Sequence, residues 1–134
     1  MSSVSIKAVL IGAVVDIAAS TILSFVLIFA FGIWLGITEP DQMQRLAESP
    51  DLYLASYFVG GLVSVFAGYL AARIAGRGEV INGTIATLIP IIGSLVINVV
   101  AAPEMLSPMM LFACYVVAPF FGVLGGYLRY RQVH

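Results

Sequence analysis

A single carboxylate interrupts the first long apolar segment of the chain. Between Ala8 and Ile37, Asp16 is the only ionisable residue. A charged side chain is costly to bury in lipid, so an acidic residue within a membrane segment is a functional candidate by default, typically in proton transfer or transport. Ser20 follows one helical turn later on the same face and gives this segment a polar stripe.

Three roles are open to Asp16. Counted back from an outer boundary near Gly36, it lies close to the inner membrane surface, where it would pair with Arg73 or Arg77. Counted forward from Lys7, it lies about 13 Å inside the membrane, as a protonatable transport residue would. The third role is a contact between subunits.

The third apolar segment carries the most polar face of the chain. Its small and polar residues recur at spacings of three or four, which places them on one side of a helix. Pro90 removes an intrahelical hydrogen bond and predicts a kink there. Such a helix either holds its neighbours together or forms a site at membrane depth. The candidate intramembrane polar site comprises Asp16, Ser20, Thr87, Ser94 and Asn98.

Residues for other chemistry are scarce. The only histidine is His134 and the only cysteine is Cys114, so neither a metal site nor a thiol pair is expected. The sequence has no Gly-x-Ser-x-Gly elbow, Cys-x-x-Cys pair or phosphate-binding glycine loop. A formal net charge of −1 without a basic cluster argues against nucleic acid. The sequence therefore predicts a non-enzymatic protein with no metal, no cofactor and no nucleic-acid partner.

The composition indicates the surroundings of these residues. Of 134 residues, 61% are hydrophobic and 10% are charged, and the mean hydropathy is +1.08. Soluble domains have roughly 45–50% apolar and 25% charged residues. Lipid leaves no water for exposed backbone groups, so the long apolar runs are predicted to be helices. We expect one all-α integral membrane domain over residues 1–134, a four-helix bundle with spans within 9–37, 52–75, 80–102 and 109–129.

The basic residues predict the orientation of the spans. Five of the six lie at segment ends on one side, whereas the other side is mostly acidic. The positive-inside rule assigns the basic side to the cytoplasm. Both termini are then cytoplasmic in the plasma (inner) membrane, with loops 38–51 and 103–108 outside. Prolines that open helices predict a short surface helix over about residues 41–48. The five basic residues are Lys7, Arg73, Arg77, Arg129 and Arg131.

Small residues form rows on two of the predicted spans. Rows with this spacing let helix backbones approach closely, within one chain or across a homo-oligomer, and a channel lining is the alternative. The ends of these spans also echo each other, since each carries Gly-Tyr-Leu before arginine. A duplication would give two parallel-related helical hairpins, although independent interfacial anchors also explain the echo. The predicted packing residues are Gly60, Ser64, Gly68, Gly122, Gly125 and Gly126.

A family resemblance covers the end of the second span and the turn after it. Residues 60–83 contain Gly60-Gly61, then Ala67-Gly68-Tyr69-Leu70-Ala71-Ala72-Arg73, a short glycine-containing turn and Asn82-Gly83. This stretch resembles small four-span prokaryotic integral membrane proteins of unknown function. The resemblance implies a fold and no particular activity.

Helix faces lined by small residues are abundant, and chemically reactive side chains are scarce. Together these features favour an oligomerising or accessory subunit. Its partners would be the lipid bilayer and either copies of itself or a larger membrane complex. The alternative is a small channel or proton-coupled transporter lined by Asp16, Ser94 and Asn98. A pore-forming lysis protein is a third interpretation. An accessory subunit should be dry around Asp16 and tolerate Asp16→Asn, whereas a transporter should lose flux on that change.

Overall fold

The computed structural model describes residues 4–101 and 112–134, and all regular structure in these ranges is helical. The all-α prediction is therefore confirmed for the described part of the chain. The first, third and fourth helices begin and end within three residues of the predicted spans. Loop 103–108 and residues 109–111 lie outside the described residues. The elements are α1 (Ile6–Trp34), α2 (Pro40–Ala47), α3 (Pro50–Ala75), α4 (Glu79–Ala101), a π-helical segment η2 (Ala113–Val117) and α6 (Ala118–Val133).

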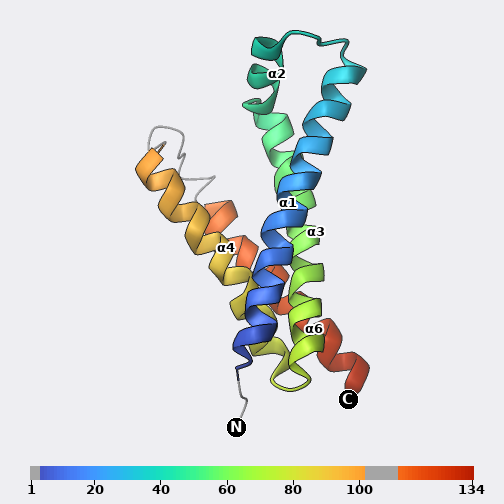
Figure 1. The fold of residues 1–134 in the computed structure, drawn as a ribbon, viewed down its shortest axis with the longest axis vertical. Coiled ribbons are helices and arrows are strands. Elements are labelled where there is room, and N and C mark those ends of the chain that lie inside the picture. The colour runs from blue at the N-terminus through green and yellow to red at the C-terminus, as the bar shows by residue number, and fades with distance from the viewer. Residues whose placement is uncertain (1–3, 102–111) are drawn as a thin grey trace.

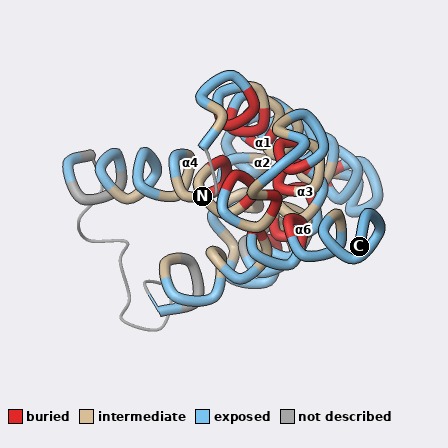
Figure 2. The backbone as a smooth tube through the Cα atoms, turned by 90° about the horizontal axis from the view of Figure 1, so that it is seen from below, coloured by how far each residue is buried: buried red, intermediate tan, exposed pale blue. Residues whose placement is uncertain are grey.

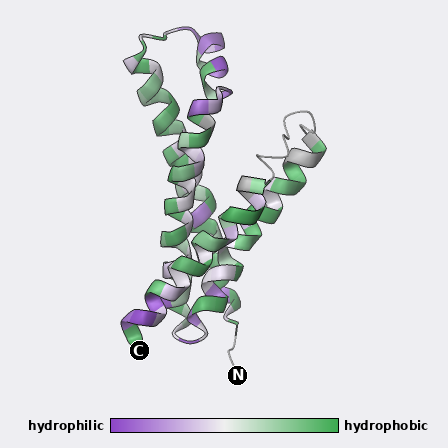
Figure 3. Cartoon of the chain, turned by 180° about the vertical axis from the view of Figure 1, so that it is seen from behind, coloured by the Kyte–Doolittle hydropathy of each residue, from purple (hydrophilic) through white to green (hydrophobic). Residues whose placement is uncertain are grey.

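Within the described residues, three helices are long and apolar enough to cross a membrane. They are α1, α3 and the first 19 residues of α4. Large apolar side chains are exposed on the outside of the bundle, for example Ile22 at 62% and Leu62 at 70%. Hydrophilic residues concentrate on α2 and near the C-terminus (Figure 3). The chain is thus a small helical protein whose outer faces suit lipid contact.

The helices form two arms of a V. One arm is the pair α1 and α3, which run side by side, and the other is α4 with η2 (Figure 1). The arms meet at the end that holds both termini and the α3–α4 turn, and they diverge toward the end that holds α2. Buried residues gather where the arms meet (Figure 2). We call this region the packed base.

Glycines make the packed base possible because they let backbones touch. A Cβ at Gly83 would lie 2.8 Å from the carbonyl oxygen of Gly68 and 3.0 Å from the Cα of Gly126. A Cβ at Gly12 would lie 2.8 Å from the Cβ of Ala71. In a bilayer, an apolar side chain gains little by exchanging lipid contacts for contacts with another helix. Close packing of this kind is therefore what holds the helices together.

A buried asparagine ties the start of α1 to the turn between α3 and α4. Gly76 and Gly78 have φ values of +66° and +61°, which few residues other than glycine adopt easily, and they reverse the chain. Asn82 is fully buried, and its Oδ1 accepts a hydrogen bond of 2.7 Å from the backbone N–H of Ser5. Its Nδ2 donates to the carbonyl oxygens of Arg77 and Gly78, at 3.1 and 2.9 Å. One side chain thereby fixes three backbone groups.

Replacing Asn82 by alanine is expected to destabilise the protein by about 2 kcal/mol, because buried backbone groups would lose their partners. The measurement is the free energy of unfolding of the purified protein in mild detergent. Gln42→Ala is the matched control, since Gln42 is an exposed amide on α2. An unchanged free energy of unfolding for Asn82→Ala would show that the turn holds without the asparagine.

Candidate functional site

Asp16 lies at the top of the packed base, where the two arms begin to separate. Its side chain is only 3% exposed. The hydroxyl of Ser64 on α3 donates to both carboxylate oxygens, at 2.9 and 3.2 Å, and the hydroxyl of Ser20 donates to Oδ1 at 3.5 Å. Two serines from two helices thus hold the carboxylate in one orientation.

The two arginines that one of the three open roles makes possible partners of Asp16 do not pair with it in the described residues. Arg73 is exposed near the C-terminal end of α3 and Arg77 is exposed just beyond it, and in the described residues Asp16 forms no ion pair with either. The reason is their position along the chain, since Ser64 lies opposite Asp16 and Arg73 comes more than two helical turns later. The described partners of the Asp16 carboxylate are neutral hydroxyls and not arginines.

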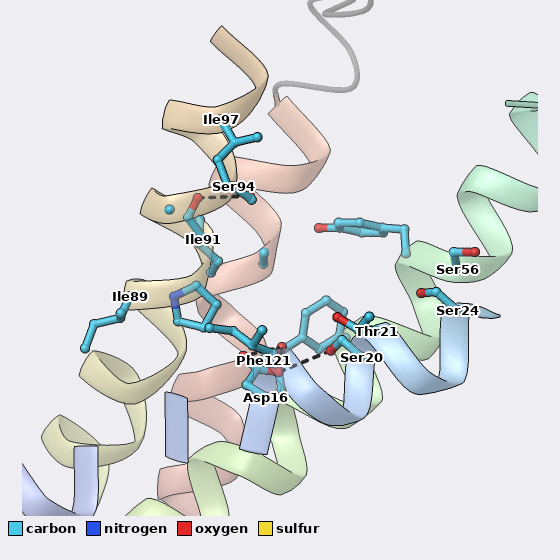
Figure 4. A pocket seen from close by; sticks show the side chains of 18 residues that line it. Asp16, Ser20, Thr21, Ser24, Ser56, Ile89, Ile91, Ser94, Ile97 and Phe121 are labelled. Atoms are coloured by element: carbon cyan, nitrogen blue, oxygen red, sulfur yellow. Dashed lines mark hydrogen bonds between the residues drawn. The ribbon is translucent and has the colours of Figure 1, made fainter. Parts of the chain in front are cut away.

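A cavity of about 540 Å³ opens above Asp16 between the two arms. Its lining comes from α1, α3, α4 and α6, and hydroxyl groups extend upward from the carboxylate on α1 and α3 (Figure 4). The opposite wall is mostly apolar and includes Pro90 and the ring of Phe121. The polar lining residues are Asp16, Ser20, Thr21, Ser24, Ser56, Tyr57, Ser64 and Ser94.

The structure brings three of the five predicted polar-site residues into this cavity. Asp16, Ser20 and Ser94 line it, and the Ser94 hydroxyl also donates to the carbonyl oxygen of Ile91 at 3.1 Å. Thr87 is instead fully buried against Gly122 of α6, and its hydroxyl donates to the carbonyl oxygen of Thr84 at 3.1 Å. The side chain of Asn98 lies outside the described residues.

The six predicted packing residues lie in three different settings. Gly68, Gly122, Gly125 and Gly126 lie in the packed base, where an added Cβ would meet atoms of neighbouring helices. At Gly60 an added Cβ would meet no described heavy atom within 4 Å, and the residue lines the cavity. The remaining packing residue, Ser64, is the principal donor to Asp16.

Several residues of the site were not singled out from the sequence. Ser56 and Tyr57 on α3 and Thr21 on α1 line the cavity. A signal existed for Ser56, because Ser56, Gly60 and Ser64 are spaced by four residues and share a helix face. No local pattern marks Tyr57, and the hydrogen bond between Asn82 and Ser5 joins residues that lie 77 positions apart in the sequence.

The chemistry available to this site is that of one carboxylate among hydroxyls and apolar walls. In the described part of the chain, no group of three His, Cys, Asp or Glu residues is placed to hold a metal ion. A carboxylate can accept a proton or balance a cation, and the hydroxyls can donate to or accept from a polar ligand. The arrangement can accept a proton or hold a polar or charged group beside an apolar wall.

Comparison with known proteins gives no assignment. No protein-family model, curated protein or solved structure matches the chain. These comparisons therefore do not assign the chain to a family on the basis of the resemblance to four-span proteins over residues 60–83. The coarser expectation of a small membrane protein agrees with the three long apolar helices.

Proposed function

We propose that this chain is a small, non-enzymatic membrane transport protein, a channel or a proton-coupled transporter, in which Asp16 is the central binding group. The observation that carries the proposal is the position of Asp16. It lines a cavity of about 540 Å³ together with hydroxyls from two helices. A bundle that only packs would be expected to fill the space beside a buried carboxylate, because unfilled volume forfeits packing contacts.

The proposed topology has four spans and cytoplasmic termini. The basic residues Lys7, Arg73 and Arg77 lie at the end with both termini, and Arg45 lies at the other end on α2. Residues 112–133 are helical without interruption, about 33 Å at 1.5 Å per residue, which supports a fourth span. In this orientation the V opens toward the outer face of the inner membrane. The contacts of α1 with α3 and of α4 with η2 and α6 support two helical hairpins, which pack against each other through α3 and α6.

The test is whether the cavity contains water in a membrane. Ser24→Cys and Ser94→Cys, each made in a Cys114→Ser background, are exposed from outside to a membrane-impermeant maleimide in intact vesicles. Because the reactive species is the thiolate, a cysteine in lipid reacts poorly and one in water reacts well. We expect both cavity cysteines to be labelled.

Two further variants calibrate the labelling. Ile22→Cys places the thiol on the lipid-facing side of α1, and Gln42→Cys places it on the exposed surface of α2. Gln42→Cys should react fully from outside, whereas Ile22→Cys should stay unlabelled. If Ser24→Cys and Ser94→Cys are as unreactive as Ile22→Cys, the cavity is dry and the transport proposal fails.

The second candidate is an oligomerising or accessory subunit, and the divergence of the arms favours it. Among the described residues, α1 and α3 pack against each other and contact α2, while α4 diverges from them toward the end that holds α2. A helix from a second copy or from a larger subunit would fit between the arms. The mass of the tagged protein isolated in mild detergent tests this, and a stoichiometric larger partner would support it.

A further inference from the structure

We propose that the Asp16 cavity binds a monovalent organic cation with an apolar body. The inference rests on the proposed transport function and specifies its substrate class. It follows from three properties of the cavity: the charge of its base, the apolar character of its walls and its size.

Among the described residues, the Asp16 carboxylate at the base of the cavity has no partner of opposite charge. In the described residues, the only groups that hydrogen-bond to the Asp16 carboxylate are the neutral hydroxyls of Ser20 and Ser64. An ionised carboxylate offers about four acceptor positions, and the two serines make three contacts. Without a partner of opposite sign, a buried carboxyl group is neutral in its protonated form, whereas its ionised form requires a compensating charge that a positively charged ligand supplies. An anion would be repelled.

The walls of the cavity select against a bare ion. Ile17, Ile89, Ile91 and Ile97 line it, with the aromatic rings of Tyr57 and Phe121. A small hydrated cation would lose water without gaining enough oxygen ligands, whereas a hydrocarbon body gains by contact with these side chains. Aromatic rings also attract organic cations through their faces.

The size of the cavity matches a small organic molecule. Ligand pockets for such molecules are usually about 300–1,000 Å³, and this cavity has about 540 Å³. The cavity is open between the two arms, so a ligand can enter it without unfolding the packed base.

The experiment uses two probes of matched shape and opposite charge, tetraphenylphosphonium and tetraphenylborate. Binding of each to the full-length protein in mild detergent is measured by titration calorimetry. We expect saturable binding of tetraphenylphosphonium and none of tetraphenylborate. Asp16→Asn should weaken tetraphenylphosphonium binding at least about tenfold. Asp41→Asn, which removes an exposed carboxylate on α2, should leave binding unchanged.

A second variant keeps the result interpretable if Asp16→Asn does not fold. Ser94→Lys leaves Asp16 and its serines intact but adds a positive charge to the opposite wall, so it should also abolish binding of the cation. Equal binding of both probes, or equal binding to Asp16→Asn, would overturn the cation proposal while leaving a ligand cavity. Absence of binding to a folded protein whose Ser24→Cys variant is labelled would overturn the substrate class alone. Absence of labelling would overturn the transport function itself.

Discussion

Replacing Asp16 by asparagine is expected to abolish transport while leaving the fold intact. Asparagine has the size of aspartate, and its side-chain oxygen can still accept the hydrogen bond that Ser64 donates at 2.9 Å. It can neither carry a proton nor balance a cation. Removing a side chain that transfers protons usually costs on the order of 10²-fold in rate. We therefore expect an imposed pH gradient across proteoliposomes to decay no faster with Asp16→Asn than with empty liposomes.

Two control variants test whether the loss of transport arises from the Asp16 carboxylate in the cavity. Asp41→Asn removes the same chemical group from the exposed surface of α2 and should transport as the wild type does. Ser64→Ala keeps the carboxylate but removes its main donor, so it should lower the flux without abolishing it. Wild-type flux through Asp16→Asn would contradict the proposal, and it would favour the accessory-subunit role.

The helices were predictable because their signals are local. Long apolar runs determine the spans of α1, α3 and α4, and Pro40 and Pro50 are the first residues of α2 and α3. Gly76 ends α3 in the left-handed conformation that its place after the apolar run predicts. Each of these inferences needs only neighbouring residues, and lipid removes the competing choice of strand.

The candidate site was predictable only in part because it depends on how helices pack. Asp16 could be found as the one carboxylate in its segment, but its donor Ser64 lies 48 residues away. Helical periodicity places Thr87 and Ser94 on one face of α4, yet the first is buried in the packed base and the second lines the cavity. The divergence of the arms above the packed base separates them, and no local pattern encodes that divergence.

Adding one methyl group at Gly125 is expected to have the largest effect on stability. A Cβ there would collide with the carbonyl oxygen of Val65 and lie 2.8 Å from the backbone nitrogen of Tyr69. These are backbone atoms within α3, which cannot move singly, so α6 as a whole must shift away. Overpacking of this kind costs about 1–3 kcal/mol, and Gly125→Ala should lie at the upper end because helices in lipid depend on close contact.

Gly60→Ala and Gly93→Ala are the matched controls for this change. An added Cβ at either position would meet no described heavy atom within 4 Å. Since alanine is the better helix former, each control should leave the free energy of unfolding unchanged or raise it by up to about 1 kcal/mol. Denaturation in mixed detergent micelles measures all three variants. If Gly125→Ala were as stable as the controls, α6 would not be packed against α3 as the structure places it, and the wall that α6 contributes to the Asp16 cavity would be lost with that contact.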